Sequence, residues 1–150
     1  MNRGNLLLAA LMMMMSGIAV GATAHAQERD PLVPRVPADQ IVAAKAWKNP
    51  YEATPQNIAK GKALYEQKGS CAVCHGKEGR GNGPAGHALI PLPRNFHNPQ
   101  FFQVKTPGEI MWVIKHGSPG TGMISYVPVI ISEDEAALII LYISRFGDQP

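Results

Sequence analysis

Two cysteines and the histidine that follows them form the stretch of this chain best suited to chemistry. They lie in Cys71-Ala72-Val73-Cys74-His75, which has the C-x-x-C-H spacing. Two thiols at this spacing can each form a thioether with one vinyl group of the same porphyrin, and the adjacent imidazole can bind the iron from one face. The motif therefore predicts covalent attachment of haem c through Cys71 and Cys74, with His75 as an axial iron ligand.

Thiol redox chemistry and zinc binding are the alternatives for the same cysteines. A redox-active C-x-x-C is expected after a strand in a βαβ unit, but residues 54–68 have the pattern of a helix. A zinc site needs four ligands, and the remaining histidines do not have the H-x3–5-H spacing. The pattern favours haem attachment over both.

The composition is that of one globular domain with appendages. The chain has 150 residues, 45% hydrophobic and 17% charged, and a formal net charge of +3. This charge is dispersed, with no basic run, so a nucleic-acid partner is not expected. Both cysteines lie in one motif, which leaves no disulfide framework. No nucleophile–base pair or carboxylate dyad can be placed, so the chain is not expected to be an enzyme in its own right.

Residues 1–26 have the features of a cleavable secretory signal peptide. Arg3 supplies the positive region, residues 6–20 the apolar core, and Ala24-His25-Ala26 the cleavage site. The apolar core is shorter than the ~20 residues that an uncleaved membrane anchor needs. We therefore expect export to the periplasm, where haem c is attached, and no transmembrane span after cleavage.

Removal of the signal leaves two methionines as candidates for a second iron ligand. Met111 lies in a helix expected over residues 106–116, where a methionine usually fills the core. Met123 follows the glycine-rich loop of residues 117–122, and a thioether on such a loop can reach the open face of the iron. We expect His75 and Met123 as axial ligands, a pair that raises the reduction potential.

Capping signals predict the helices that position these residues. Thr54-Pro55 and Thr106-Pro107 each start a helix, and Ser132-x-x-Glu135 is a capping box. The helix that begins at Ser132 is apolar nearly all round, and we expect it to be covered on more than one side and to end at Gly147. His116 is expected to complement a helix dipole rather than to bind iron.

The segment between the motif and the helix that begins at Thr106 is expected to surround the haem. Residues 76–86 are rich in glycine and should form a loop round the haem edge. The apolar residues expected to wall the pocket are Leu89, Ile90, Leu92 and Phe96. Arg94 is either a hydrogen-bond partner of a haem propionate or a surface residue.

Residues 27–53 form a proline-containing N-terminal extension ahead of a domain at 54–150. Residues 39–48 are expected to make a short helix, with Ile41, Val42 and Trp47 as its apolar contacts. The extension is either a strap packed over the domain, which we favour, or a docking arm for a partner.

Residues 54–147 resemble a class I cytochrome c of the small bacterial single-haem type. The stretches that carry the resemblance are Gly61-Lys62-Ala63-Leu64-Tyr65, Cys71 to Gly76, Gly81-Asn82-Gly83-Pro84-Ala85, Gly122-Met123 and Leu141-Tyr142. The resemblance implies an all-α cytochrome c fold, with three to four main helices wrapped around one covalent haem. It also implies that the first and last helices cross at Gly61, with Tyr142 as the facing aromatic residue, and that Pro91 or Pro93 orients His75 through a backbone carbonyl. Ile124 departs from the family, in which proline often follows the methionine.

The expected function is one-electron transfer by a periplasmic carrier, with redox proteins as partners. A haem c subunit of a multi-protein respiratory oxidoreductase is the alternative, which the proline-containing extension and the apolar last helix keep open. Residues 81–96 also resemble haem subunits or partners of bacterial respiratory complexes. A haem sensor or peroxidase is a third. The lysines that could steer acidic partners are Lys60, Lys62, Lys68, Lys77 and Lys115.

Overall fold

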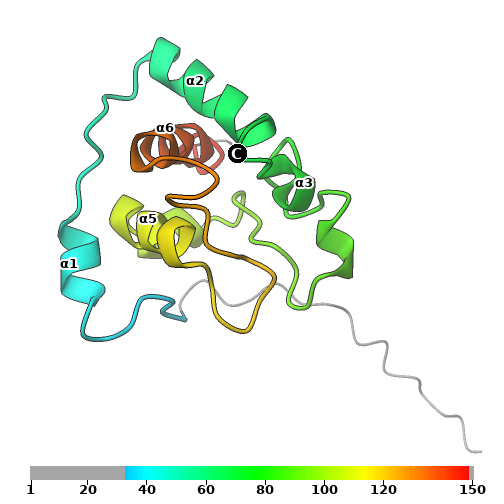
Figure 1. The fold of residues 1–150 in the computed structure, drawn as a ribbon, viewed down its shortest axis with the longest axis horizontal. Helices are drawn as coiled ribbons and strands as arrows, with labels where there is room; N and C mark the ends of the chain where they lie inside the picture. The colour runs from blue at the N-terminus through cyan, green and yellow to red at the C-terminus, as the bar shows by residue number, and fades with distance from the viewer. Residues whose placement is uncertain (1–32, 149–150) are drawn as a thin grey trace, which may run out of the picture.

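The computed structural model describes residues 33–148, which contain helices and loops and no strand. The helices are α1 (Ile41–Ala46), α2 (Pro55–Glu66), α3 (Ala72–His75), a 3-10 turn (Gly86–Ala88), α4 (Phe101–Val104), α5 (Pro107–His116) and α6 (Glu133–Ser144). The all-α prediction is confirmed, and α2, α5 and α6 are the three long helices (Figure 1). Within these residues no helix is long and apolar enough to cross a bilayer.

Helices α2 and α6 cross in close contact, as the resemblance implied. A side chain at Gly61 would run into the backbone carbonyl of Leu138, and its next neighbour would be the Cβ of Tyr142. The missing side chain at Gly61 therefore lets two backbones approach. Both helices begin as expected: the Thr54 hydroxyl accepts from the Asn57 N–H, and Ser132 and Glu135 form a complete capping box.

The core lies between α6, α5 and the inner side of α2. Ile139, Ile140 and Ile143 of α6 are buried, and so is Ile110 of α5. Met111 is only 2% exposed within this cluster, which agrees with its predicted place in the core.

The described part of the N-terminal extension, residues 33–53, packs against α5 through α1 and forms a strap (Figure 1). Ala44 is buried against Gly108, where any side chain would meet the Ala44 carbonyl. One helical turn after Gly108, the Trp112 indole N–H donates to the Gln40 side-chain oxygen over 2.8 Å, and this bond also holds the strap against α5. Val42 is 77% exposed, so its predicted role as an apolar contact was wrong.

One helix was not predicted, and two predicted helix ends differ from the structure in detail. Helix α4 was not predicted, because it has one turn and no side-chain cap. Helix α6 ends at Ser144, before Gly147, and the N–H groups of residues 145–147 form turns by donating to carbonyls three residues earlier. Helix α2 ends at Glu66 rather than near Lys68. The predicted signal peptide, residues 1–26, lies outside the described residues.

Candidate haem site

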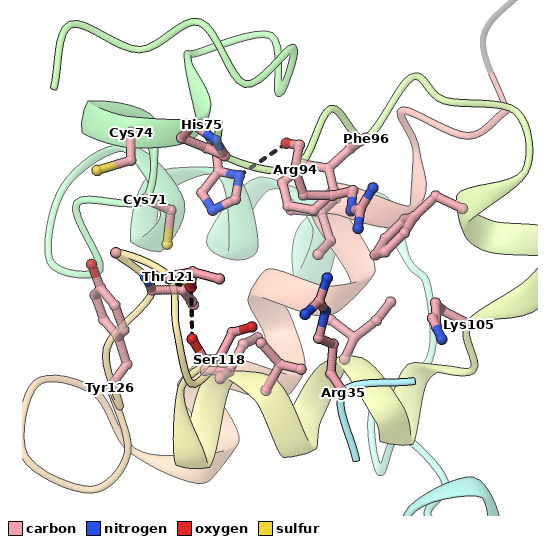
Figure 2. Close-up of a pocket in the computed structure, with 18 of the residues that line it drawn as sticks. Arg35, Cys71, Cys74, His75, Arg94, Phe96, Lys105, Ser118, Thr121 and Tyr126 are labelled. Carbon is pink, nitrogen blue, oxygen red and sulfur yellow. Dashed lines mark hydrogen bonds between the residues drawn. The ribbon is translucent and has the colours of Figure 1, made fainter. Parts of the chain in front are cut away.

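A largely apolar cavity lies between α3, α5, α6 and the loop that carries Met123. Its lining brings together Cys71, Cys74, His75 and Met123, the four residues selected from the sequence. Figure 2 shows the two cysteines and His75 at one end of this cavity. Leu89, Leu92 and Phe96 also line it, whereas Ile90 is 82% exposed and does not. The prediction of Ile90 as a wall residue was therefore wrong, because its side chain points out of the extended segment into solvent.

The two cysteines lie at the start and within the single turn of α3, and their sulfur atoms are not joined in a disulfide. Burial raises the pKa of the Cys71 thiol to about 11, so it stays protonated near neutral pH. The glycine-rich loop packs against this turn: the Gly83 N–H donates to the Cys74 carbonyl and the Gly81 N–H to the His75 carbonyl. A side chain at Gly83 would collide with the Val73 carbonyl. The glycines thus let the loop cap the motif closely.

The ring of His75 is held by a backbone carbonyl and an aromatic face. Its Nδ1 lies 3.1 Å from the Arg94 carbonyl oxygen, which can only accept, so Nδ1 carries the proton (Figure 2). Phe96 stacks on the ring at 4.8 Å between centroids. Burial lowers the pKa of His75, and the neutral tautomer leaves the Nε2 lone pair for a metal.

The partner of His75 corrects one expectation. The carbonyl was expected from Pro91 or Pro93, and the structure assigns it to Arg94. Gly81 explains the register, because a side chain there would collide with the Pro93 carbonyl. That proline is therefore packed against the glycine-rich loop, and the next carbonyl along the chain reaches the imidazole.

The loop before Met123 is closed by its own hydrogen bonds. The Ser118 N–H donates to the Met123 carbonyl over 2.9 Å, and the Met123 N–H donates to the Thr121 hydroxyl oxygen over 3.1 Å. The Thr121 hydroxyl donates in turn to the Ser118 carbonyl. Met123 is therefore presented to the cavity by a shaped loop. His116 is exposed and packs on Trp112, away from the cavity.

The end of the cavity away from the cysteines is lined by basic side chains. Arg94 is one of them, and its guanidinium lies 5.2 Å from the centre of the Phe101 ring. Sequence reasoning missed the other two, Arg35 and Lys105. Arg35 lies 36 residues before Cys71 and Lys105 lies 30 residues after His75. No spacing rule connects a strap residue or the residue after α4 with the pocket.

These residues fit haem c. The lining is mostly apolar, as a porphyrin face requires, and it holds two thiols, an imidazole with an available Nε2 and a thioether. A cationic end suits the haem carboxylates. The donor set therefore agrees with the cofactor that the C-x-x-C-H spacing predicts.

The family model for "cytochrome C oxidase, cbb3-type, subunit III" matches residues 56–143, which is more than half of the chain. The chain belongs to this family of c-type cytochromes. Family membership implies haem c as the cofactor and makes the chain an electron-transfer protein rather than an enzyme.

A solved structure with a similar fold is the Kuenenia stuttgartiensis reducing HAO-like protein complex Kustc0457/Kustc0458. The two chains are 30% identical, with a TM-score of 0.56 and coverage of 65% of this chain. This chain corresponds to 46% of that one, so it spans less than half of the neighbour's length. No curated protein sequence matches this chain.

Proposed function

We propose that this cytochrome is a periplasmic one-electron carrier that holds a single haem c through Cys71 and Cys74, with His75 and Met123 as axial ligands. The observation that carries the proposal is that the imidazole and the thioether line the same cavity as both thiols. When bound, the haem iron supplies a one-electron couple between its ferric and ferrous forms.

The residues of the chain fix the ligands and exclude water. The Arg94 carbonyl and the Phe96 ring hold the His75 imidazole, and the loop hydrogen bonds hold Met123. If His75 and Met123 both held the haem iron, no coordination position would be left for a substrate, which would suit a carrier better than a peroxidase. Ile139 and Ile143 of α6 supply apolar lining, and a low dielectric strengthens the electrostatic control of the potential.

Two matched methionine variants test the ligand assignment. Met123→Leu should remove the sulfur-to-iron charge-transfer band of the ferric protein, lower the midpoint potential and allow carbon monoxide to bind the ferrous protein. Met111→Leu makes the same chemical change in the core, should cost less than ~1.5 kcal/mol of stability, and should keep the band. Loss of the band in Met111→Leu alone would reverse the assignment. Carbon monoxide binding by the wild type would favour a sensor or peroxidase.

A haem subunit of a respiratory complex is the second candidate function. The family description names an oxidase subunit, and the structural neighbour belongs to a complex. Exposed apolar side chains at Ile90, Ile124 and Val129 are also consistent with a covered surface. Purification from the native membrane and periplasm separates the candidates: a monomer supports the carrier, and stable co-purification with partner chains supports the subunit.

Electrostatic steering of acidic redox partners by lysines is part of the carrier proposal. The candidate lysines differ in whether a nearby carboxylate partly neutralises their charge. Lys68 pairs with Glu135 at 2.7 Å and Lys115 with Glu133 at 2.8 Å, and Lys62 lies 3.8 Å from Glu66. These pairs weaken the positive field of three of the five candidate lysines. A rate of electron transfer that falls with added salt would support steering, and a flat response would remove it.

A further inference from the structure

The pocket has two chemically different ends. The thiols of Cys71 and Cys74 lie at one end, and Arg35, Arg94 and Lys105 line the other. Figure 2 shows the guanidinium groups of Arg35 and Arg94 directed into the same part of the pocket, away from the cysteines. The three cations come from the strap, from the extended segment before α4 and from the residue after α4.

Arg35 is carried by a part of the strap that is fixed to the domain. Its neighbour Val36 is only 4% exposed and also lines the pocket. On the other side, the Lys105 ammonium donates to the Val33 carbonyl over 3.3 Å. Lys105 thus bonds the strap within two residues of Arg35, and the strap becomes one wall of the pocket.

The cations are close enough to repel one another. Burial lowers the pKa of Lys105, Glu109 raises it, and the charges of Arg35 and Arg94 lower it further. Glu109 is buried, with one carboxylate oxygen 3.8 Å from the Lys105 ammonium and the other in the capping box with Thr106. Glu109 lines the pocket together with the three cations.

Haem carries the matching charges at the matching place. Its two propionates lie on the porphyrin edge opposite the vinyl groups, so vinyl groups at Cys71 and Cys74 direct the propionates toward the cationic end. An arginine fork is suited to bidentate contact with a carboxylate.

We propose that Arg35 of the N-terminal strap binds a haem propionate and, with Lys105 and Arg94, forms a cationic clamp through which the strap sets the reduction potential. The proposal rests on the proposed function, because it needs haem c in this pocket. The strap is then part of the redox centre, and not only a cover on α5. Removing a positive charge beside the propionates disfavours the electron added on reduction, which lowers the midpoint potential.

Redox titration of the full-length holoprotein tests the clamp. The variant is Arg35→Gln, the conservative variant is Arg35→Lys, and the control is Arg80→Gln, which removes an exposed arginine that does not line the pocket. A pyridine haemochrome assay first measures covalent haem in each protein. We expect equal haem content in all four, a lower midpoint potential in Arg35→Gln, recovery of most of the shift in Arg35→Lys, and no shift in Arg80→Gln.

The outcomes separate this proposal from the proposed function. An Arg35→Gln potential equal to, or higher than, that of the wild type would overturn the clamp while leaving the carrier intact. Equal shifts in Arg35→Gln and Arg80→Gln would also overturn it, because the effect would then be one of general surface charge. A wild type without covalent haem would overturn the carrier itself. If Arg35→Gln did not fold, the charge-preserving Arg35→Lys decides: its potential must stay near that of the wild type.

Discussion

At the scale of single residues, Tyr65 fixes the backbone of the C-x-x-C-H turn by a hydrogen bond from its side chain. Tyr65 is 1% exposed, and its hydroxyl donates to the Gly76 carbonyl over 2.7 Å. Gly76 follows His75 directly, so this bond from α2 fixes the end of the turn that carries the imidazole. Burial raises the pKa of Tyr65, which keeps the hydroxyl protonated and able to donate.

Tyr65→Phe should destabilise the fold by ~1–2 kcal/mol, because it removes a buried hydrogen bond and leaves the carbonyl with one partner fewer. Tyr142→Phe is the matched control: its hydroxyl lies 3.4 Å from the Lys77 carbonyl in an exposed position, so its removal should cost less than ~0.5 kcal/mol. Denaturant unfolding of both variants measures the difference. An equal loss of unfolding free energy in the two variants would show that the Tyr65–Gly76 hydrogen bond does not stabilise the fold more than an exposed one does.

The residues that form the candidate site were predictable to different degrees. Cys71, Cys74 and His75 follow from spacing alone, and Met123 from its place in a glycine-rich loop. The Arg94 carbonyl was not predictable, because every residue has a carbonyl and only the packing of Gly81 selects this one. Arg35 and Lys105 were missed because the pocket joins segments that have no common sequence pattern.

Among the elements, the α2–α6 crossing frames the pocket. The starts of α2, α5 and α6 were predicted from their capping residues, and all three caps form the expected hydrogen bonds. The end of α5 at His116, before Gly117, agrees with the prediction, whereas the ends of α2 and α6 and the one-turn helix α4 were not predicted correctly. The crossing itself was implied by the resemblance, through Gly61, rather than by helix periodicity.

Gly61→Ala tests the crossing through the sign of its effect. Helix propensity alone predicts that alanine stabilises a helix by ~1 kcal/mol relative to glycine. The Leu138 carbonyl blocks the new methyl group, so α2 and α6 must separate, and we expect a net loss of ~1–3 kcal/mol. Thermal unfolding measures the change in stability. Ala59→Gly, at an exposed site of α2, measures the effect of helix propensity alone in the same helix. A stabilised Gly61→Ala would contradict the close crossing.

At the scale of the whole molecule, the strap, the helices and the loops each supply residues to the one pocket proposed to hold the haem. The strap supplies Arg35, α3 the thiols and imidazole, the loop after α5 the thioether, and α6 an apolar wall. The long helices were predictable because caps and apolar patterns describe each of them separately, and the cytochrome c fold class was implied by the family resemblance. The role of the strap was not, since proline-containing segments of this kind serve equally as covers, walls or docking arms.

The most direct test of the central claim is an alkaline pyridine haemochrome assay of protein produced in cells that attach haem c. The account predicts one haem per chain that resists extraction with acidified acetone. Cys71→Ser with Cys74→Ser should lose this resistance. Haem that is extracted from the wild type, or a wild type without haem, would contradict the assignment of the pocket.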